Sequence, residues 1–214
     1  MGIKKLFAAR DMTQGAPWQR ILEFSIPMLI GNVAQQLYNT ADSVIVGKFV
    51  GDNALAAVGS AMPILNLLLA LFVGIATGAG IVISQSYGAR DREGLSKSIG
   101  NCISLAFIAS LVIMVVGPLL TRPMLELLGT PDSILDWCTA YLKIQFFGIA
   151  GFFFYNMLSG VLRGLGDSVS ALGFLLLAAA LNVVLDLWFM AGFDMGVAGV
   201  SLATVIAQSI SALF

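Results

Sequence analysis

The sequence predicts an all-α integral membrane protein, built as a bundle of six transmembrane helices. The first observation is composition: 58% of the 214 residues are hydrophobic and 11% are charged, whereas soluble domains carry about 25% charged residues. The second is that six apolar stretches follow one another, each long enough for a bilayer span of about 20 residues. Because so few charges could not cover a globular surface in water, we expect lipid around the chain.

Residues typical of turns separate the six expected helices. Their ranges are 18–48, 54–84, 95–121, 136–162, 170–191 and 196–214. Pro27 and Pro63 fall inside the first and second helices, and each removes a backbone hydrogen bond, so both helices should bend. In the second helix, Gly74 and Gly78 have the spacing of a close approach between helices.

The remaining four helices have fewer interruptions. The third is rich in Leu, Ile and Val, and the fourth contains the aromatic run Phe152, Phe153, Phe154, Tyr155. These aromatics could line a pocket, although contacts with lipid or with other helices are more common. The fifth and sixth helices are apolar except for a few amides, hydroxyls and one acid. Arg122, Glu126, Asp132 and Asp136 are expected in an outer loop between the third and fourth helices.

Basic residues indicate the orientation. They precede the first helix, lie between the second and third, and follow the fourth: Lys4, Lys5, Arg10, Arg20, Arg90, Arg92, Lys97 and Arg163. Positive charge stays on the cytoplasmic side, so we expect a multi-pass protein of the inner (plasma) membrane with residues 1–17 in the cytoplasm. The apolar part of that segment is too short for a signal peptide, so the first helix should act as its own anchor.

Several classes of function are excluded by missing residues. The chain has no His, which removes Ser-His-Asp catalysis and His-ligated metals, and no phosphate-binding Gly-x-x-x-x-Gly-Lys-Ser/Thr loop. A net charge of −1 lacks the basic stripe of a nucleic-acid binder. We therefore expect no enzyme, no organic cofactor and no nucleic-acid partner. Cys102 and Cys138 are interpreted as apolar packing residues.

Polar side chains gather inside the predicted spans. A stripe with spacings of three and four runs along the first helix: Asn32, Gln35, Gln36, Asn39 and Asp42. It cannot face acyl chains, because each unpaired group would cost several kcal/mol. The amides alone could form a seam between helices, but an ionised carboxylate within a span indicates function.

Four oxygen-bearing residues on three helices reach a similar depth. Asp42 and Asp186 lie roughly 9 and 8 Å from the outer ends of their helices, and Asn182 and Thr204 roughly 13 and 12 Å. Oxygen ligands suit a hard cation such as Na⁺, and a desolvated carboxyl could instead exchange a proton. We therefore predict a site for Na⁺ or H⁺ at Asp42, Asn182, Asp186 and Thr204.

Three segments carry a resemblance that spans the chain. They are Pro27 with Gln35-Gln36-Leu37-Tyr38-Asn39-Thr40-Ala41-Asp42, then Ser84-Gln85-Ser86-Tyr87-Gly88-Ala89, then Leu162-Arg163-Gly164-Leu165-Gly166-Asp167-Ser168. With them the chain resembles the multidrug and toxic compound extrusion (MATE) transporters, in the bacterial and archaeal branch of DNA-damage-inducible-type exporters. In that branch an Asp on the first helix joins an Asn and an Asp on the fifth and a Thr on the sixth. Asp42, Asn182, Asp186 and Thr204 match these positions.

The resemblance implies a cation-coupled (Na⁺ or H⁺) antiporter that exports organic, often cationic, drugs. It also implies twelve helices in two lobes, of which residues 18–214 form the N-terminal lobe. We expect that the chain is cut before the second lobe, which would be its partner unless a second half-size chain replaces it. Gln35, Tyr38, Asn39 and Asn156 should line the substrate cavity, and Pro27 matches the family's bending proline.

Three alternatives are open. A lipid-linked oligosaccharide flippase has a related fold, but such flippases typically carry basic residues in their cavity, whereas these spans hold acids and amides. Gly164-Leu165-Gly166-Asp167 matches part of the motif of aspartyl intramembrane proteases, whose second Asp and Pro-Ala-Leu are missing here. A membrane scaffold would leave Asp42 and Asp186 without an evident use.

Overall fold

The computed structural model describes residues 15–49, 51–193 and 195–214, and the regular structure in these ranges is entirely helical. Its elements are α1 (Pro17–Phe49), α2 (Asp52–Gly88), α3 (Arg92–Leu127), α4 (Asp132–Phe147), α5 (Ile149–Gly164), α6 (Ser168–Leu187), the π-helical turn η2 (Trp188–Gly192) and α7 (Gly196–Leu213). The predicted cytoplasmic segment 1–17 lies mostly outside the described residues.

The all-α membrane fold is confirmed. Within the described ranges, α2, α3, α6 and α7 are long and apolar enough to cross a membrane, and so are α4 and α5 when the bent pair is taken as one segment. α1 has 33 residues, about 50 Å of helix, but its polar stripe lowers its hydropathy. The six predicted helices are thus α1, α2, α3, the bent pair, α6 with η2, and α7.

The fourth helix, predicted as one helix over 136–162, is two helices, α4 and α5. The chain bends by 53° between α4 and α5, and Gly148 separates the two helices. A Cβ at this position would overlap the side chain of Val205 on α7. α7 therefore approaches the chain at the break, where Gly148 leaves room for it.

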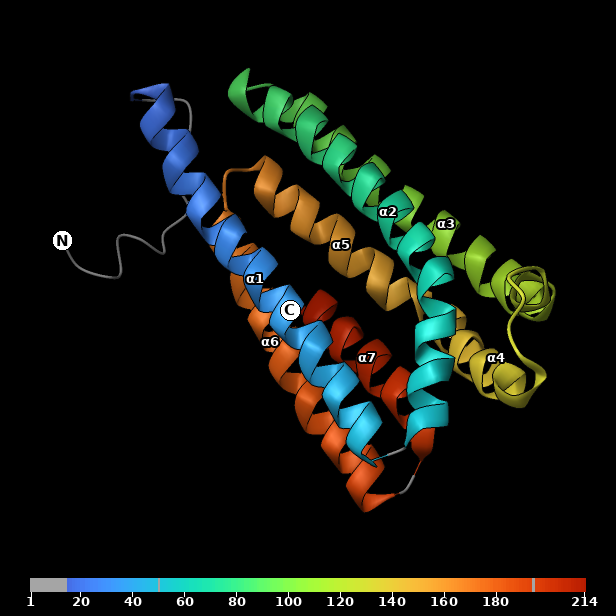
Figure 1. Ribbon diagram of the computed structural model, residues 1–214. Helices are drawn as coiled ribbons and strands as arrows, with labels where there is room; N and C mark the ends of the chain where they lie inside the picture. Colours follow the sequence, from blue (N-terminus) through green and yellow to red (C-terminus); the bar gives the residue numbers. More distant parts are fainter. Residues whose placement is uncertain (1–14, 50, 194) are drawn as a thin grey trace.

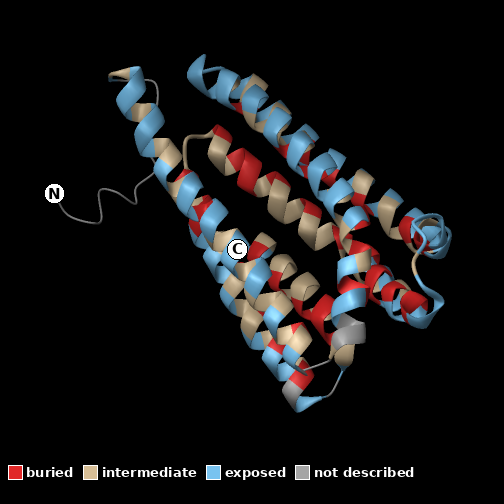
Figure 2. Cartoon of the chain, in the orientation of Figure 1, coloured by how far each residue is buried: buried red, intermediate tan, exposed pale blue. Residues whose placement is uncertain are grey.

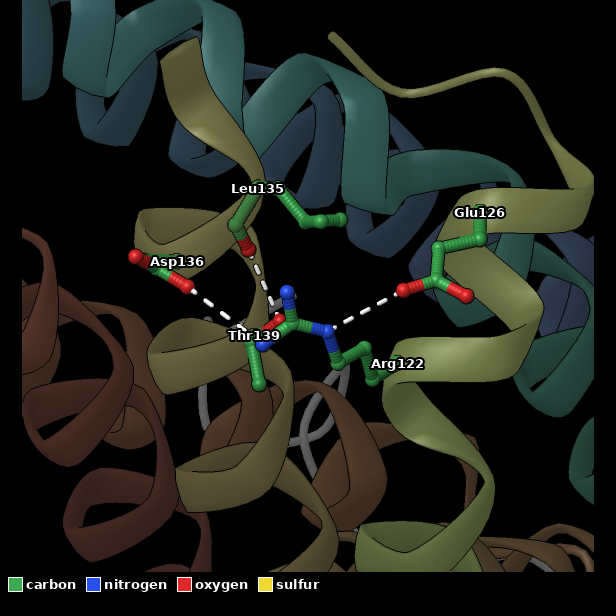
Figure 3. Close-up of polar contacts among 5 residues, drawn as sticks. All are labelled: Arg122, Glu126, Leu135, Asp136 and Thr139. Carbon is green, nitrogen blue, oxygen red and sulfur yellow. Dashed lines mark hydrogen bonds and ion pairs between the residues drawn. The ribbon is translucent and has the colours of Figure 1, made fainter. Parts of the chain in front are cut away.

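The loop expected between the third and fourth helices is shorter than predicted, because residues on both sides of it are helical. α3 continues through Pro123 to Leu127, and α4 already begins at Asp132. Figure 3 shows how Arg122 joins the two helices: its Nε lies 3.0 Å from Glu126 Oε1, and its Nη1 lies 3.8 Å from Asp136 Oδ1. These groups are exposed, so such pairs contribute at most about 1 kcal/mol.

The helices form two groups with α5 between them (Figure 1). α2 and α3 pack along α5 on one side, while α1 packs along α6, and α6 along α7, on the other. One buried cluster includes Phe72 and Phe153, whose rings stack at 4.3 Å. A second cluster joins α2, α4 and α7 around Leu142 and Val200.

Glycines permit the closest approach between helices, but not those predicted. Gly74 and Gly78 of α2 have no other group within 4 Å of a built Cβ. Instead, a Cβ at Gly160 would lie 2.5 Å from Ala76 O, and one at Gly164 would lie 2.7 Å from Gly80 O. The backbones of α2 and α5 therefore touch at Ala76 and Gly80, two residues along α2 from the predicted pair and on a different face of the helix.

The outward faces are apolar and exposed, as expected for contact with lipid. Figure 2 shows the exposed residues along the outer sides of α1, α2 and α3, with buried residues concentrated on and around α5. Leu67 and Leu119, for example, are 68% and 74% exposed. Such a surface would be unstable in water.

Candidate functional site

The polar stripe of α1 is held largely by hydrogen bonds within the helix. Gln35 Nε2 donates to Asn39 Oδ1 at 3.2 Å, and Asn39 Nδ2 donates to Gln36 Oε1 at 3.4 Å. These residues are three and four apart, so they are neighbours on one face. Asp42 extends the same face by one turn.

Asn182 links α6 to α7. Asn182 and Asp186 are fully buried, and Thr204 is half-buried. The amide orientation that satisfies all partners donates from Asn182 Nδ2 to Asp186 Oδ2 at 2.8 Å, and its oxygen lies 3.2 Å from Thr204 Oγ1. Which end of an amide is oxygen follows from its hydrogen-bond partners.

Asp42 of α1 completes the group. Its carboxyl lies within hydrogen-bonding reach of that of Asp186. Asp42 Oδ1 and Asp186 Oδ1 are both buried and have no hydrogen-bond partner among the described residues. The structure thus brings together all four residues of the predicted cation site.

The donor set suits a hard cation. Two carboxyls, an amide and a hydroxyl supply oxygen atoms, the ligands that hard cations prefer. Two carboxylates that share a buried site repel each other unless a cation or a proton lies between them. The described ranges hold no cluster of three or more His, Cys, Asp or Glu side chains. A cation or a proton shared by the two carboxyls would satisfy the Oδ1 atoms of Asp42 and Asp186, which have no other partner among the described residues.

Two tyrosines that the sequence did not link to the site lie beside the carboxyls. The Tyr38 hydroxyl lies near the Thr204 side chain. Tyr141 of α4 is buried, its side chain lies near Gln145, and its backbone oxygen accepts from Ser201 Oγ at 3.0 Å. Tyr38 was expected in the cavity only, and no spacing signal relates Tyr141 to the acids.

A cavity of about 430 Å³ opens next to this group. All four predicted cavity residues line it, as do the predicted hinge and two members of the cation site: Gln35, Tyr38, Asn39, Asn156, Pro27, Asp42 and Thr204. Side chains from α2, α4, α5 and α6 complete the wall. Asn182 and Asp186 lie behind the wall, within reach of the cavity through Asp42 and Thr204.

The aromatic residues of α5 have both of the roles considered from the sequence: some line a pocket, and others pack against neighbouring helices. Phe152 and Tyr155 line the cavity, whereas Phe153 is fully buried and packs on Phe72. Pro27 also faces the cavity, and α1 continues as one helix on both sides of it. Its role as a hinge stays a prediction.

The fold and the site define a class: a helical membrane lobe with a polar internal cavity beside two buried carboxyls. The chain belongs to the MatE family, whose model matches residues 27–188. The resemblance noted in the sequence is thereby confirmed.

Similar proteins are named for multidrug resistance or export. The probable multidrug resistance protein YpnP of Bacillus subtilis (strain 168) is 35% identical, with 96% of this chain and 46% of that protein covered. The multidrug export protein MepA of Staphylococcus aureus (strain MRSA252) is 26% identical, with coverages of 92% and 44%. The chain spans about half the length of these relatives.

Solved structures share the fold. A transporter of the MOP superfamily from Pyrococcus furiosus matches with a TM-score of 0.89 and 31% identity, over 95% of this chain and 45% of that one. A MATE structure in the bent conformation matches with a TM-score of 0.88 and 31% identity, over 94% and 45%. One in the straight conformation matches with a TM-score of 0.88 and 30% identity, over 95% and 45%. The matched part is one lobe.

Proposed function

We propose that this chain is the N-terminal lobe of a cation-coupled antiporter that exports organic, often cationic, compounds in exchange for Na⁺ or H⁺. The observation that carries the proposal is the pair of carboxyls of Asp42 and Asp186, whose buried Oδ1 atoms have no partner among the described residues. The names of its relatives, multidrug resistance and export proteins, support the substrate class.

Coupling would arise from competition through Asp42. This residue belongs both to the carboxyl pair and to the cavity wall, so a coupling ion at the pair changes the charge that a cationic substrate meets. Tyr38, Phe152 and Tyr155 add aromatic faces to the wall, and such faces attract organic cations. Substrate and ion would therefore bind in alternation.

The bend of α1 at Pro27 would convert this alternation into opening and closing of the cavity. Pro27 lines the cavity on the same helix as Asp42, and a proline is where a helix kinks most readily. Relatives solved as bent and as straight conformations match this chain equally well. The second lobe, or a second half-size chain, would supply the facing wall.

Basic residues favour an inner-membrane protein whose N-terminal segment is cytoplasmic. In this orientation the start of α1 and the end of α5, with Arg163, lie on the cytoplasmic side, and the carboxyl pair lies in the outer half.

The test is efflux by the full-length protein in everted vesicles, with Na⁺ and pH gradients imposed separately. Asp186→Asn should reduce cation-driven efflux about tenfold or more, because one charge of the pair is lost. The matched control is Asp132→Asn, which removes an exposed carboxylate at the start of α4. Full cation-driven efflux by Asp186→Asn would refute the proposal.

The second candidate, a lipid-linked oligosaccharide flippase, is favoured by one observation. The cavity wall includes a basic residue, Arg163, whereas the sequence suggested only acids and amides there. Gradient-independent movement of a lipid-linked sugar by the full-length protein would select this candidate.

A further inference from the structure

The cavity carries opposite charges at its two ends. Among its described lining residues, Asp42 and Arg163 are the two with a formal charge. Arg163 lies in the last turn of α5, just before α6 begins, whereas Asp42 contacts Asp186 near the end of α6. The length of α6 from Ser168 to Asp186 is about 27 Å at 1.5 Å per residue. The two charges are therefore too far apart to neutralise each other.

The guanidinium of Arg163 has no acidic partner within the described residues. No ion pair or side-chain hydrogen bond involves it there. The carboxylate next in sequence, Asp167, accepts from Ser170 N at 2.9 Å and from Ser170 Oγ at 2.7 Å. The Asp167 side chain thus caps the start of α6. Arg163 is half-buried and lines the cavity, so its N–H donors are available to a molecule bound there.

Other polar groups lie on the same wall. Asn156, Ser159 and Arg163 recur at spacings of four and three on α5, so they share one face, and all three line the cavity. Ser168, at the start of α6, is buried and also lines it. Between this end and Asp42 the wall includes the apolar side chains of Leu172 and Leu175.

We propose that Arg163 forms an anion subsite of the cavity, which binds the carboxylate, sulfonate or phosphate group of an amphipathic compound. The planar guanidinium can donate two parallel hydrogen bonds to such an oxyanion, and the apolar wall would cover the rest of the molecule. This inference deepens the proposed function, on which it rests for transport: zwitterions and anionic amphiphiles join the organic cations as substrates. The anion could come from a soluble compound or from a lipid headgroup.

The test is binding of two fluorescent probes to the purified full-length protein in detergent. Dansylglycine and its methyl ester differ only in the carboxylate, so their affinity ratio isolates the anion. We expect the acid to bind about tenfold or more tightly than the ester, as for a hydrogen bond to a charged group. Arg163→Gln should bring the ratio close to one, and Arg163→Lys should retain part of it because the charge stays.

Lys143→Gln is the matched control, since it removes an exposed positive charge of α4 that does not line the cavity. This variant should keep the affinity ratio of the unchanged protein. Competition by short-chain phosphatidylglycerol against dansylglycine, lost in Arg163→Gln, would identify a lipid phosphate as an occupant of the subsite. If phosphatidylglycerol does not compete while the acid-to-ester affinity ratio is unchanged, the occupants of the subsite are soluble anions.

An equal affinity for acid and ester in the unchanged protein would overturn the proposal. So would a ratio that survives Arg163→Gln, or a lower thermal stability of that variant without any change in the ratio, since Arg163 would then pair with the second lobe. The binding ratio needs no ion gradient. If the ratio holds while efflux shows no cation coupling, the subsite stands and the proposed antiport fails.

Discussion

Asn182 shows how a single amide can organise a buried acidic site. It lies between Asp186 and Thr204, with contacts of 2.8 and 3.2 Å, and it is fully buried. Because one side chain bridges two helices, its loss would leave Asp186 Oδ2 without this donor and would remove the contact with Thr204 on α7. In a buried site, a polar group that loses its hydrogen-bond partner lowers the stability of the fold, because water cannot replace the partner.

Asn182→Ala should therefore lower the free energy of unfolding of the full-length protein by about 1–3 kcal/mol. It should also weaken stabilisation by the coupling ion, measured as the shift of thermal unfolding on adding Na⁺ or lowering the pH. Asn39→Ala, which truncates an exposed amide of α1, is the control and should leave both quantities nearly unchanged. Equal effects of the two variants would contradict the assignment.

The four residues of the candidate site were predictable from the sequence, because polar residues of these types are rare in membrane spans and the four lie at similar depths. Tyr141 could not be reached in the same way. A tyrosine within a span has ordinary packing roles, and its place beside the acids depends on how α4 lies against α7, where Ser201 Oγ donates to its backbone oxygen. Arg163 directly follows the predicted fourth helix, so the distribution of basic residues predicts only that it lies on the cytoplasmic side, and no spacing relates it to the cavity.

At the scale of elements, the contact between α2 and α5 depends on glycine. Gly160 and Gly164 of α5 face backbone oxygens of Ala76 and Gly80, so added carbon atoms would force the two helices apart. Such overpacking typically costs about 1–3 kcal/mol. The glycines of α2 with the predicted spacing, Gly74 and Gly78, have open space instead.

Gly160→Ala should consequently destabilise the protein by about 1–3 kcal/mol, despite the better helix propensity of alanine. Gly78→Ala is the paired control on α2, and it should be neutral or stabilising by up to about 1 kcal/mol. Thermal unfolding of the two variants in the same detergent gives the comparison. A Gly160→Ala protein as stable as Gly78→Ala would show that α2 and α5 separate freely.

The extent of each helix was largely predictable, since apolar length determines a span. The break at Gly148 was not, because it coincides with a close contact with Val205, a residue 57 positions further along the chain. Nor was the length of α3, because the charged residues Arg122 and Glu126 were expected beyond the end of the third helix at residue 121. There the charges of Arg122 and Glu126 pair along the helix instead.

At the scale of the whole molecule, the exposed apolar faces and the distribution of basic residues make a prediction about topology. Glu93 lies in the first turn of α3 and Asp132 in the first turn of α4, so they should lie on opposite sides of the membrane. Cys102 and Cys138 are buried and should react slowly with a charged maleimide.

In intact cells, Asp132→Cys should be labelled by a membrane-impermeant maleimide, whereas Glu93→Cys should be labelled only after the cells are opened. The unchanged protein, with its two buried cysteines, is the background control. The reverse pattern would invert the orientation that the basic residues indicate. Labelling of both sites from one side would mean that α3 does not cross.

The hydrogen bonding of α1 has a consequence for how this helix could move. Between residues 31 and 46, the amides Gln35, Gln36 and Asn39 bond to one another, and Thr40 and Ser43 donate to backbone oxygens of α1 itself. Polar contact with other helices in this stretch comes from Tyr38 and Asp42, which are one turn apart. α1 could therefore slide or tilt as a unit while the hydrogen bonds among its amides and hydroxyls stay intact. The turn from Tyr38 to Asp42 would then be the part of α1 that holds this helix to the bundle, and binding at this turn would strengthen or release that contact.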